Sequence, residues 1–458
     1  MGAGLAGLAA ATDVAAAGRE VVVLEARDRV GGRLLSRDLG DGVTVDLGAQ
    51  WIGPTQDRMY ALGRDLGVST FPTYDRGDTV ALLDGRRYRF SGRLPRLNPV
   101  VLADFAAAFL RLERLARRVP LDRPWEAPAA REWDAQTLET WIRRRVRTDT
   151  ARRVLRLFTD GVFTTEPGSL SLLFALWYIR SGTSLENLVS TTGGAQQDRV
   201  AGGTQTLARR MAERLGETVV LGVPVRRIEQ TGGGVTVAAN GLAVRARRAI
   251  VAVPPALAAR IEYAPALPGT RDQLTQRMPH GATIKAMAVY DEPFWRAEGL
   301  HGQAGSPGLP VSFTFDGSPE AGTPGVLVGF LVADAARRAG RLDAARRREV
   351  VLECFRRYFG PRAARPRDYV DQDWSEEEWT RGCYGGHLPP GALTRYGPAL
   401  REPVGAIHWA GTESARVWAG YMEGAVESGR RAAAEVLAAL DGPAASPSAT
   451  TDEAAAEG

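Results

Sequence analysis

The sequence predicts an α/β fold built from more than one structural unit, and three observations lead to this expectation. The chain has 458 residues, whereas a single domain commonly has roughly 150. A glycine-rich turn at the start leads into a run of strong helix formers at 5–17, and a buried-strand pattern follows at 20–26. Alternating apolar runs between 225 and 253 have the pattern of paired strands.

The first elements along the chain are marked by their end signals. Gly18 provides a C-terminal stop for the helix at 5–17. The run EVVVLEA at 20–26 is typical of a strand buried on both faces. Later, strands at 225–228 and 235–239 are predicted to join across three glycines, and Asn240-Gly241 predicts a tight turn into a third strand within 242–253.

Helical periodicity marks three further segments. Residues 103–118 and 332–359 have apolar positions at helical spacing, with arginine on the polar side. The last predicted helix runs near 421–440. The segment 441–458 is low in complexity, and we expect it to be disordered.

Composition excludes several classes of protein. The chain is 44% hydrophobic and 24% charged, and no run approaches the roughly 18 apolar residues of a membrane span, so we expect a soluble protein without a membrane partner. Its net charge of +5 reflects 58 basic residues, of which Lys285 is the only lysine. The arginine runs at 143–145 and 346–348 lie in helical patterns beside acidic residues, which favours solvated helix faces over nucleic-acid binding. Four histidines and two cysteines are scattered without metal-ligand spacing, so we expect no metal site and no disulfide framework.

A nucleotide-binding motif opens the chain. Gly2, Gly4 and Gly7 fit G-x-G-x-x-G ahead of a helix, and Glu25 ends the next strand. Such glycines let backbone amides approach a pyrophosphate at a helix N-terminus, and the carboxylate accepts ribose hydroxyls. This motif alone fits both NAD and FAD. A second glycine pair in the run EARDRVGGR (25–33) is similar to flavoproteins of the glutathione reductase type and favours FAD in a Rossmann-like domain.

One feature departs from that motif. The fingerprint needs a strand before its first glycine, and here only Met1 precedes Gly2. The missing strand would be central in the sheet, so its loss should expose apolar helix faces and weaken dinucleotide binding. Our hypothesis is that the natural start lies a few codons upstream. Equal retention of flavin by the 458-residue form and an extended form would refute it.

A series of motifs in order resembles the flavin-containing monoamine oxidases, in a bacterial and soluble form. The resemblance runs from Gly2 to about Leu440. The motifs that carry it are EARDRVGGR (25–33), DLGAQWIGPTQ (46–56), LWYIRSGTS (176–184), STTGGAQ (190–196), the segment around Lys285 with EPFW (292–295), GCY…PPG (382–391) and AGTESARVWAGYMEGAVESG (410–429).

The resemblance implies a Rossmann-like FAD-binding domain with an inserted α+β substrate domain. The FAD domain is expected from 1–69, 201–274 and 377–440, and the substrate domain from 70–200 and 275–376. In this family the FAD contacts would be made by a set of conserved-motif positions and pyrophosphate-binding glycines: Gly2, Gly4, Gly7, Glu25, Arg27, Gly32, Arg33, Val225, Trp374, Cys383, Gly411, Thr412 and Met422.

Three residues match the family's catalytic positions. Lys285 corresponds to the lysine that holds a water against flavin N5, where a compact ammonium stabilises charge as oxygen is reduced. Tyr384 and Tyr421 match the two roughly parallel tyrosines of an aromatic cage that guides the amine to the flavin. Cys383 stands where some relatives attach FAD through a thioether, while other relatives bind FAD non-covalently, so both modes stay open.

By the same resemblance, six small, apolar or neutral residues line the substrate pocket: Gly161, Val162, Val189, Gln196, Phe313 and Phe330. These positions contain no carboxylate to bind a second ammonium and no arginine to bind a carboxylate. They therefore favour an aryl- or alkyl-substituted primary amine over putrescine or an amino acid.

The leading function is an amine oxidase that converts an amine to an imine or aldehyde and reduces O2 to H2O2. The alternatives are an oxidase for a polyamine, an L-amino acid or a biosynthetic intermediate, and a flavin-binding protein without turnover. We expect a cytoplasmic location, because the polar end of the chain lacks the membrane-anchoring helix of mitochondrial relatives. Relatives often form homodimers, and no residue here decides the oligomeric state.

Overall fold

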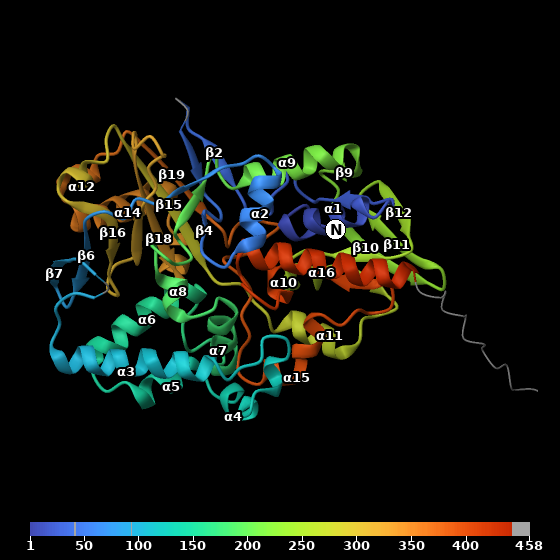
Figure 1. The fold of residues 1–458 in the computed structure, drawn as a ribbon, viewed down its shortest axis with the longest axis horizontal. Coiled ribbons are helices and arrows are strands. Elements are labelled where there is room, and N and C mark those ends of the chain that lie inside the picture. Colours follow the sequence, from blue (N-terminus) through green and yellow to red (C-terminus); the bar gives the residue numbers. More distant parts are fainter. Residues whose placement is uncertain (41–42, 93, 442–458) are drawn as a thin grey trace, which may run out of the picture.

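A computed structural model describes residues 1–40, 43–92 and 94–441 of the chain (Figure 1). It has the predicted α/β architecture. A strand-rich part around β15, β16 and β18 lies beside a helical part containing α3, α6 and α7, and a third part contains α1, α16 and the strands β10 to β12. Of the predicted tail at 441–458, only Asp441 lies within the described residues, and it ends the last helix.

The glycine-rich start leads into α1 (Leu5–Ala16), as predicted. The strand expected at 20–26 is paired only over β1 (Val23–Leu24), which lies parallel to β9 (Val219–Val220). A second parallel pair consists of β13 (Ala249–Val251) and β20 (Ile407–Trp409). The parallel arrangement is therefore present as two short pairs.

The first two residues connect these pairs. The Gly2 N–H donates to the Leu24 carbonyl at 2.7 Å, and the Met1 amino group donates to the Ile250 carbonyl at 2.8 Å. The Ala252 N–H in turn donates to the Met1 carbonyl at 3.0 Å. Met1 and Gly2 thus occupy the central place between the two parallel pairs.

Helix α16 (Met422–Asp441) packs against α1, and the two lie side by side in Figure 1. A Cβ atom on Gly429 would stand 2.2 Å from the Ala6 carbonyl oxygen, so only glycine permits this approach. Helix α9 (Gln205–Leu215) also contacts α1. The apolar residues of α1 are consequently buried, contrary to the exposure expected from the missing strand.

The predicted hairpin turn at Asn240-Gly241 is confirmed, because Ala239 pairs with Leu242 across it. The run at 242–253 is not one strand, however: β12 joins an antiparallel sheet, whereas β13 turns away to pair with β20. The four-stranded sheet has the order β12-β11-β10-β14, with bounds β10 (Val225–Thr231), β11 (Gly234–Ala239), β12 (Leu242–Ala246) and β14 (Glu262–Ala264).

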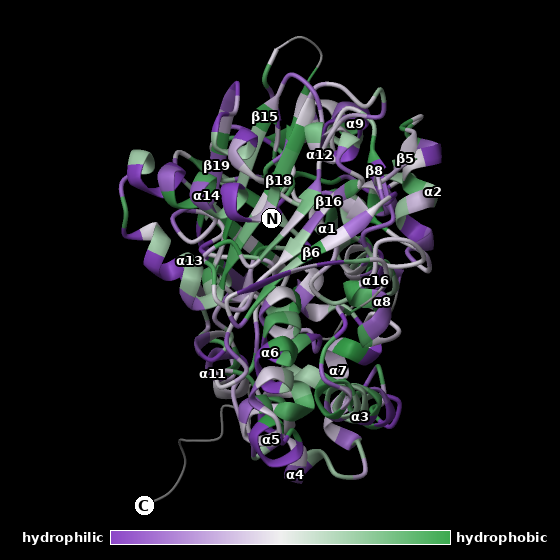
Figure 2. Ribbon diagram, turned by 90° about the vertical axis from the view of Figure 1, so that its left-hand side faces the viewer, coloured by the Kyte–Doolittle hydropathy of each residue, from purple (hydrophilic) through white to green (hydrophobic). Residues whose placement is uncertain are grey.

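A seven-stranded mixed sheet carries Lys285, in the order β19-β15-β18-β17-β16-β6-β7. The adjacent interior strands β15 and β18 are buried along their whole length and are largely apolar in Figure 2. The bounds are β6 (Asp78–Leu83), β7 (Arg86–Phe90), β15 (Thr283–Tyr290), β16 (Leu300–Gly305), β17 (Phe313–Asp316), β18 (Gly325–Val332) and β19 (Asp368–Asp373).

Helices cover this part of the molecule. The helix predicted at 103–118 is α3, which begins earlier, at Pro99, because the Asn98 side chain accepts a hydrogen bond from the Val100 N–H. The bounds of the helical part are α3 (Pro99–Ala116), α4 (Ala130–Asp134), α5 (Leu138–Arg145), α6 (Asp149–Phe163), α7 (Leu172–Ser181) and α8 (Leu185–Val189).

The prediction of one helical run at 332–359 is wrong. Val332 ends β18, and two helices follow, α13 (Ala333–Gly340) and α14 (Ala344–Phe359). The second begins anew because the Asp343 carboxylate accepts from the Arg346 N–H.

The remaining elements are β2 (Ser36–Asp38), β3 (Thr44–Asp46), β4 (Trp51–Ile52), α2 (Asp57–Asp65), β5 (Thr70–Pro72), β8 (Asp198–Val200), α10 (Pro255–Ala258), α11 (Gly269–Gln276), α12 (Phe294–Ala297) and α15 (Ala392–Tyr396).

Candidate active site

A large cavity of about 1330 Å³ extends from the glycine-rich start of α1 to the seven-stranded sheet and the helices beside it. It brings together residues from almost the whole length of the chain. With the exception of Gly7, every residue predicted from the sequence lines it: Gly2, Gly4, Glu25, Arg27, Gly32, Arg33, Gly161, Val162, Val189, Gln196, Val225, Lys285, Phe313, Phe330, Trp374, Cys383, Tyr384, Gly411, Thr412, Tyr421 and Met422.

The glycine-rich end of the cavity has the features of an anion site. Helix α1 begins after Gly4 without a side-chain cap, which leaves backbone N–H groups at its N-terminus. Gly31 and Gly32, both with positive φ, approach Gly4 from the opposite side. Gly7 does not line the cavity. The Gly2 carbonyl oxygen fills the space beside it, because a Cβ on Gly7 would stand only 1.9 Å from that oxygen. The role of Gly7 is to let the helix pack closely on the turn.

Glu25 lies at the end of β1 beside this site and is buried. Its two carboxylate oxygens accept from the Ala3 N–H at 2.6 Å and the Arg27 N–H at 3.0 Å. A carboxylate has about four lone-pair positions, so capacity remains for ribose hydroxyls. Arg27 is held in turn by Glu377, which accepts from its Nε at 3.0 Å. These residues fit the pyrophosphate and ribose of FAD.

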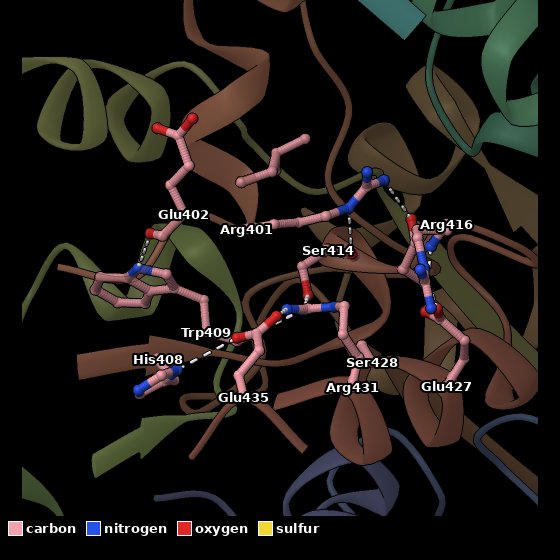
Figure 3. Close-up of polar contacts among 12 residues, drawn as sticks. Arg401, Glu402, His408, Trp409, Ser414, Arg416, Glu427, Ser428, Arg431 and Glu435 are labelled. Carbon is pink, nitrogen blue, oxygen red and sulfur yellow. Dashed lines mark hydrogen bonds and ion pairs between the residues drawn. The ribbon is translucent and has the colours of Figure 1, made fainter. Parts of the chain in front are cut away.

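The Gly411–Ser414 turn lies at the cavity and is held by the polar network of Figure 3. Ser428 of α16 accepts from the Gly411 N–H at 3.0 Å, and Arg431 donates to the Ser414 hydroxyl at 3.1 Å. Arg401 donates to the Ser414 carbonyl at 2.9 Å. Helix α16 therefore fixes the position of Gly411 and Thr412 from behind.

A buried ion pair ties the same turn to the second glycine motif. Arg33 donates to Glu413 at 2.6 Å and 3.1 Å and to the Tyr384 carbonyl at 2.6 Å. His280 lies 3.2 Å from Glu413. Burial alone would raise the pKa of the Glu413 carboxyl, but the charge of Arg33 and the hydrogen bonds from His280 and Arg33 hold it well below its usual range. Glu413 was missed by sequence reasoning, because its partners lie far away in the chain.

Lys285 lies on β15 and is 2% exposed. Its Nζ donates to the Gly48 carbonyl at 2.9 Å and to Gln50 Oε1 at 2.7 Å. The amine stands 5.4 Å from the centre of the Trp51 ring and 5.5 Å from that of Phe330. Burial lowers the pKa of Lys285 to about 7, although the Asp46 carboxylate opposes this shift.

Tyr384 and Tyr421 both line the cavity, from the loop before α15 and from the residue before α16. Burial raises the pKa of each phenol, and the neighbouring Tyr421 raises that of Tyr384 further, so both rings remain neutral. The Thr412 hydroxyl donates to the Tyr421 carbonyl at 2.8 Å and so positions this tyrosine. That the two rings are roughly parallel stays a prediction.

Cys383 also lines the cavity, as a buried free cysteine. Burial raises its pKa to about 12, with Arg33 acting in the opposite direction. The Thr164 hydroxyl donates to the Cys383 carbonyl at 2.6 Å and fixes the backbone between the cysteine and Tyr384.

The substrate end of the cavity has an aromatic wall. Phe313 and Phe330 stack with their ring centres 5.0 Å apart. A Cβ on Gly161 would stand 3.0 Å from the Phe313 ring, so the glycine provides the space that this ring occupies. Val162 and Val189 add apolar surface, and Gln196 donates to the Leu188 carbonyl at 3.0 Å.

Some cavity residues have polar atoms without a partner. Gln50 Nε2, Trp51 Nε1 and Gln196 Oε1 are buried and make no hydrogen bond within the protein. Buried groups of this kind are normally satisfied, so these three atoms fit a cavity that binds a large polar ligand such as FAD. Gln50 and Trp51 lie within DLGAQWIGPTQ, but their sequence neighbours gave no signal of this role.

Within residues 1–40, 43–92 and 94–441, no helix combines the length and the hydropathy needed to cross a membrane.

Comparison with known proteins identifies the family. The model of the family described as flavin containing amine oxidoreductase matches residues 5–437. The chain is 45% identical over 440 residues to the putative flavin-containing monoamine oxidase AofH of Mycobacterium tuberculosis, covering 96% of each chain. It is 40% identical to the probable flavin-containing monoamine oxidase A of Dictyostelium discoideum, covering 95% of this chain and 96% of the relative.

Solved structures agree with these relatives. A putrescine oxidase bound to putrescine matches with a TM-score of 0.92 and 37% identity, covering 95% of this chain and 98% of that one. The cyclohexylamine oxidase from Brevibacterium oxydans also matches with a TM-score of 0.92, at 33% identity, covering 96% and 98%. The chain therefore belongs to the flavin-containing amine oxidoreductase family and is an FAD-dependent amine oxidase.

Proposed function

We propose that this enzyme oxidises a primary aryl- or alkyl-amine to the imine, which water hydrolyses to aldehyde and ammonia, while O2 is reduced to H2O2. The observation that carries the proposal is the single cavity that contains Lys285, Tyr384 and Tyr421 together with an apolar wall. When bound, FAD supplies the two-electron acceptor and the centre that reacts with oxygen. The steps left to the protein are binding, orientation and control of charge.

The cavity wall selects the neutral form of the amine. Phe313, Phe330, Tyr384 and Tyr421 present aromatic surface to the substrate, and both tyrosines stay uncharged. An ammonium loses its hydration in such an environment, so the equilibrium shifts toward the neutral amine, whose lone pair assists oxidation. The two tyrosine rings orient the amine group between them.

Lys285 provides the one lysine ammonium of the chain. The Gly48 carbonyl and Gln50 Oε1 hold its Nζ in a fixed direction, and the rings of Trp51 and Phe330 lie beside it. A positive charge in a low-dielectric site stabilises negative charge that develops during oxygen reduction. The same Nζ can hold and release a proton near neutral pH, because burial brings its pKa to about 7.

A panel of amines scored for peroxide tests the proposal. Flavin-loaded protein is mixed with benzylamine, phenylethylamine, alkylamines, diaminobutane and L-amino acids, and H2O2 release is measured. We expect release with the monoamines and little with the amino acids. The proposal would be contradicted if only the L-amino acids released H2O2, or if none of the compounds in the panel did.

Covalent attachment of FAD through Cys383 is a separate proposal, supported by the place of this free cysteine in the cavity lining. Acid precipitation tests it: the flavin should stay with the pellet of the wild type and enter the supernatant for Cys383→Ala. Yellow supernatant from both proteins would refute it.

The division of the chain into an FAD-binding domain of three segments and a substrate domain of two segments is likewise proposed. It is supported by the seven-stranded sheet, whose strands all fall within 70–200 and 275–376. A homodimer and a cytoplasmic location stay predictions, which light scattering and cell fractionation would test.

A further inference from the structure

A polar group lies on the cavity wall away from Lys285, where β6 and β16 meet two loops. The Asp75 carboxylate accepts from Gln303 Nε2 at 3.2 Å and from the Thr192 hydroxyl at 2.8 Å. His301 Nδ1 stands 3.5 Å from Asp75 Oδ1, while its Nε2 is 2.9 Å from the Thr79 hydroxyl. All five of these residues line the cavity.

The His301 ring is 5% exposed, and its Nδ1 has no hydrogen-bond partner. Burial lowers the pKa of this histidine, although three nearby carboxylates oppose the shift. A neutral imidazole that donates from Nε2 to Thr79 presents an acceptor at Nδ1, next to the Asp75 carboxylate. In that tautomer two acceptors meet at one point of the wall, and the buried His301 Nδ1 makes no hydrogen bond within the protein.

Asp75 also has no arginine or lysine partner among the residues that the structure describes, in a chain rich in arginine. Its neighbours differ: Asp78 pairs with Arg89 at 2.7 Å, and Asp316 pairs with Arg296 at 2.8 Å. Asp75 keeps 28% of its side chain exposed and contacts only His301 among groups that can be cationic. Its negative charge is left available to a ligand in the cavity.

The sheet register gives the distance from this polar group to Lys285. Lys285 pairs with Phe330, Phe330 with Phe313, and Phe313 with Gly305 of β16. Three strand spacings of about 4.8 Å, and two residues along β16, place the backbone of Gln303 on the order of 15 Å from that of Lys285. The wall between them carries Phe313, Phe315 and Phe330, which suits a methylene chain.

We propose that Asp75 and His301 form a subsite for a second protonated amine, at the far end of a long-chain α,ω-diamine whose reacting amine lies between Tyr384 and Tyr421. This inference rests on the proposed amine oxidation and names a substrate class for it. The charge-assisted hydrogen bond to Asp75 is formed equally in the ground and transition states, so its effect falls on KM and leaves kcat nearly constant. A short diamine such as diaminobutane cannot span the distance.

The same contacts would also be expected if Asp75 only anchored the two loops to β16. Asp75→Asn separates these roles, because asparagine keeps the shape and can keep both hydrogen bonds, with the Thr192 hydroxyl accepting instead of donating. Only the negative charge is lost. Asp65→Asn, at an exposed ion pair with Arg214 away from the cavity, is the matched control. Glu186→Gln tests a second carboxylate of the substrate end of the cavity, away from Glu25 at the glycine-rich end.

The experiment compares peroxide formation from diaminodecane, decylamine and benzylamine by the flavin-loaded wild type and the three variants. We expect Asp75→Asn to raise KM for diaminodecane about tenfold or more, with kcat and the monoamine constants unchanged. An unchanged diamine KM, an equal rise for decylamine, or a rise in Glu186→Gln instead would overturn the subsite. Loss of activity on all three amines would show that Asp75 acts through the fold and would also overturn it.

Calorimetric titration of the protein with diaminodecane in the absence of oxygen measures the Kd of the diamine and so tests the subsite independently of turnover. If the wild type releases no peroxide from any amine, the proposed function fails, yet a Kd that rises about tenfold in Asp75→Asn still supports the subsite. An equal Kd in the two proteins refutes it, whatever the activity.

Discussion

Lys285 shows how one side chain is adapted to its surroundings. Its Nζ reaches two acceptors, the Gly48 carbonyl and Gln50 Oε1, and stands beside the rings of Trp51 and Phe330. A planar guanidinium has five donors and a larger body, and it would find neither the space nor the partners here. This explains why the only lysine of an arginine-rich chain stands at this position.

Replacement of Lys285 by Met should slow reoxidation of the reduced flavin by O2 by roughly 100-fold, because a positioned charge is lost. In the wild type, the rate should fall as the pH rises through about 7, since the ammonium then loses its proton. The variant should lack this pH dependence. Stopped-flow mixing of anaerobically reduced protein with oxygen measures both, with Arg277→Met, at the exposed position that follows α11, as control.

Gly161→Ala tests the space beneath Phe313. The added methyl group would stand 3.0 Å from the ring and push it into the substrate cavity. We expect KM for benzylamine to rise about tenfold, with a smaller rise for short alkylamines. Gly168→Ala, whose methyl group meets only ordinary contacts, should leave both constants unchanged. Equal constants in the two variants would place Phe313 outside the pocket.

At the scale of elements, the Gly411–Ser414 turn is joined to the second glycine motif by the Arg33–Glu413 ion pair. Glu413→Gln would leave the half-buried Arg33 guanidinium without its counter-ion, at a cost of about 2 kcal/mol in the free energy of unfolding. Urea unfolding of the two proteins at neutral pH measures this. A difference within experimental error would mean that the pair has no net effect on stability.

The pH dependence of this contribution has a definite sign. The pKa of Glu413 is depressed in the folded chain relative to about 4.3 when unfolded, so its stabilisation is present above that pH and is lost below it. The gap in stability between the wild type and Glu413→Gln should therefore narrow as the pH falls below about 4. A gap that widens in acid would contradict the assignment.

The contact between α1 and α16 supplies a second test at this scale. Gly429→Ala places a methyl group against the Ala6 carbonyl and should force the helices apart, at a cost of about 1–3 kcal/mol and with loss of bound flavin. Thermal unfolding and flavin content after gel filtration check this. Gly269→Ala, where nothing lies within 4 Å of the added group, is the control.

At the scale of the whole molecule, local sequence signals predicted local structure well. The helix after the glycine-rich start and the turn at Asn240-Gly241 depend on neighbours along the chain, and both are confirmed. The break at Asp343 was missed because the apolar spacing continues across it, while one side-chain cap restarts the helix.

The candidate site was predictable only where a motif marked it. Asp75 gave no signal, because its partners Thr192, His301 and Gln303 come from distant segments that only the folded chain brings together. The pairing of Arg33 with Glu413 was hidden for the same reason. Contacts of this kind, between segments far apart in the sequence, can be identified only from the tertiary structure.

The central claim is that one cavity brings Lys285, Tyr384 and Tyr421 to a bound flavin so that an amine can reduce it. Anaerobic mixing of the flavin-loaded protein with benzylamine tests this most directly, with visible flavin absorbance as the readout. The account predicts complete loss of that absorbance, followed by its recovery and stoichiometric H2O2 on admission of O2. A flavin that dithionite bleaches but that no primary amine reduces would contradict it.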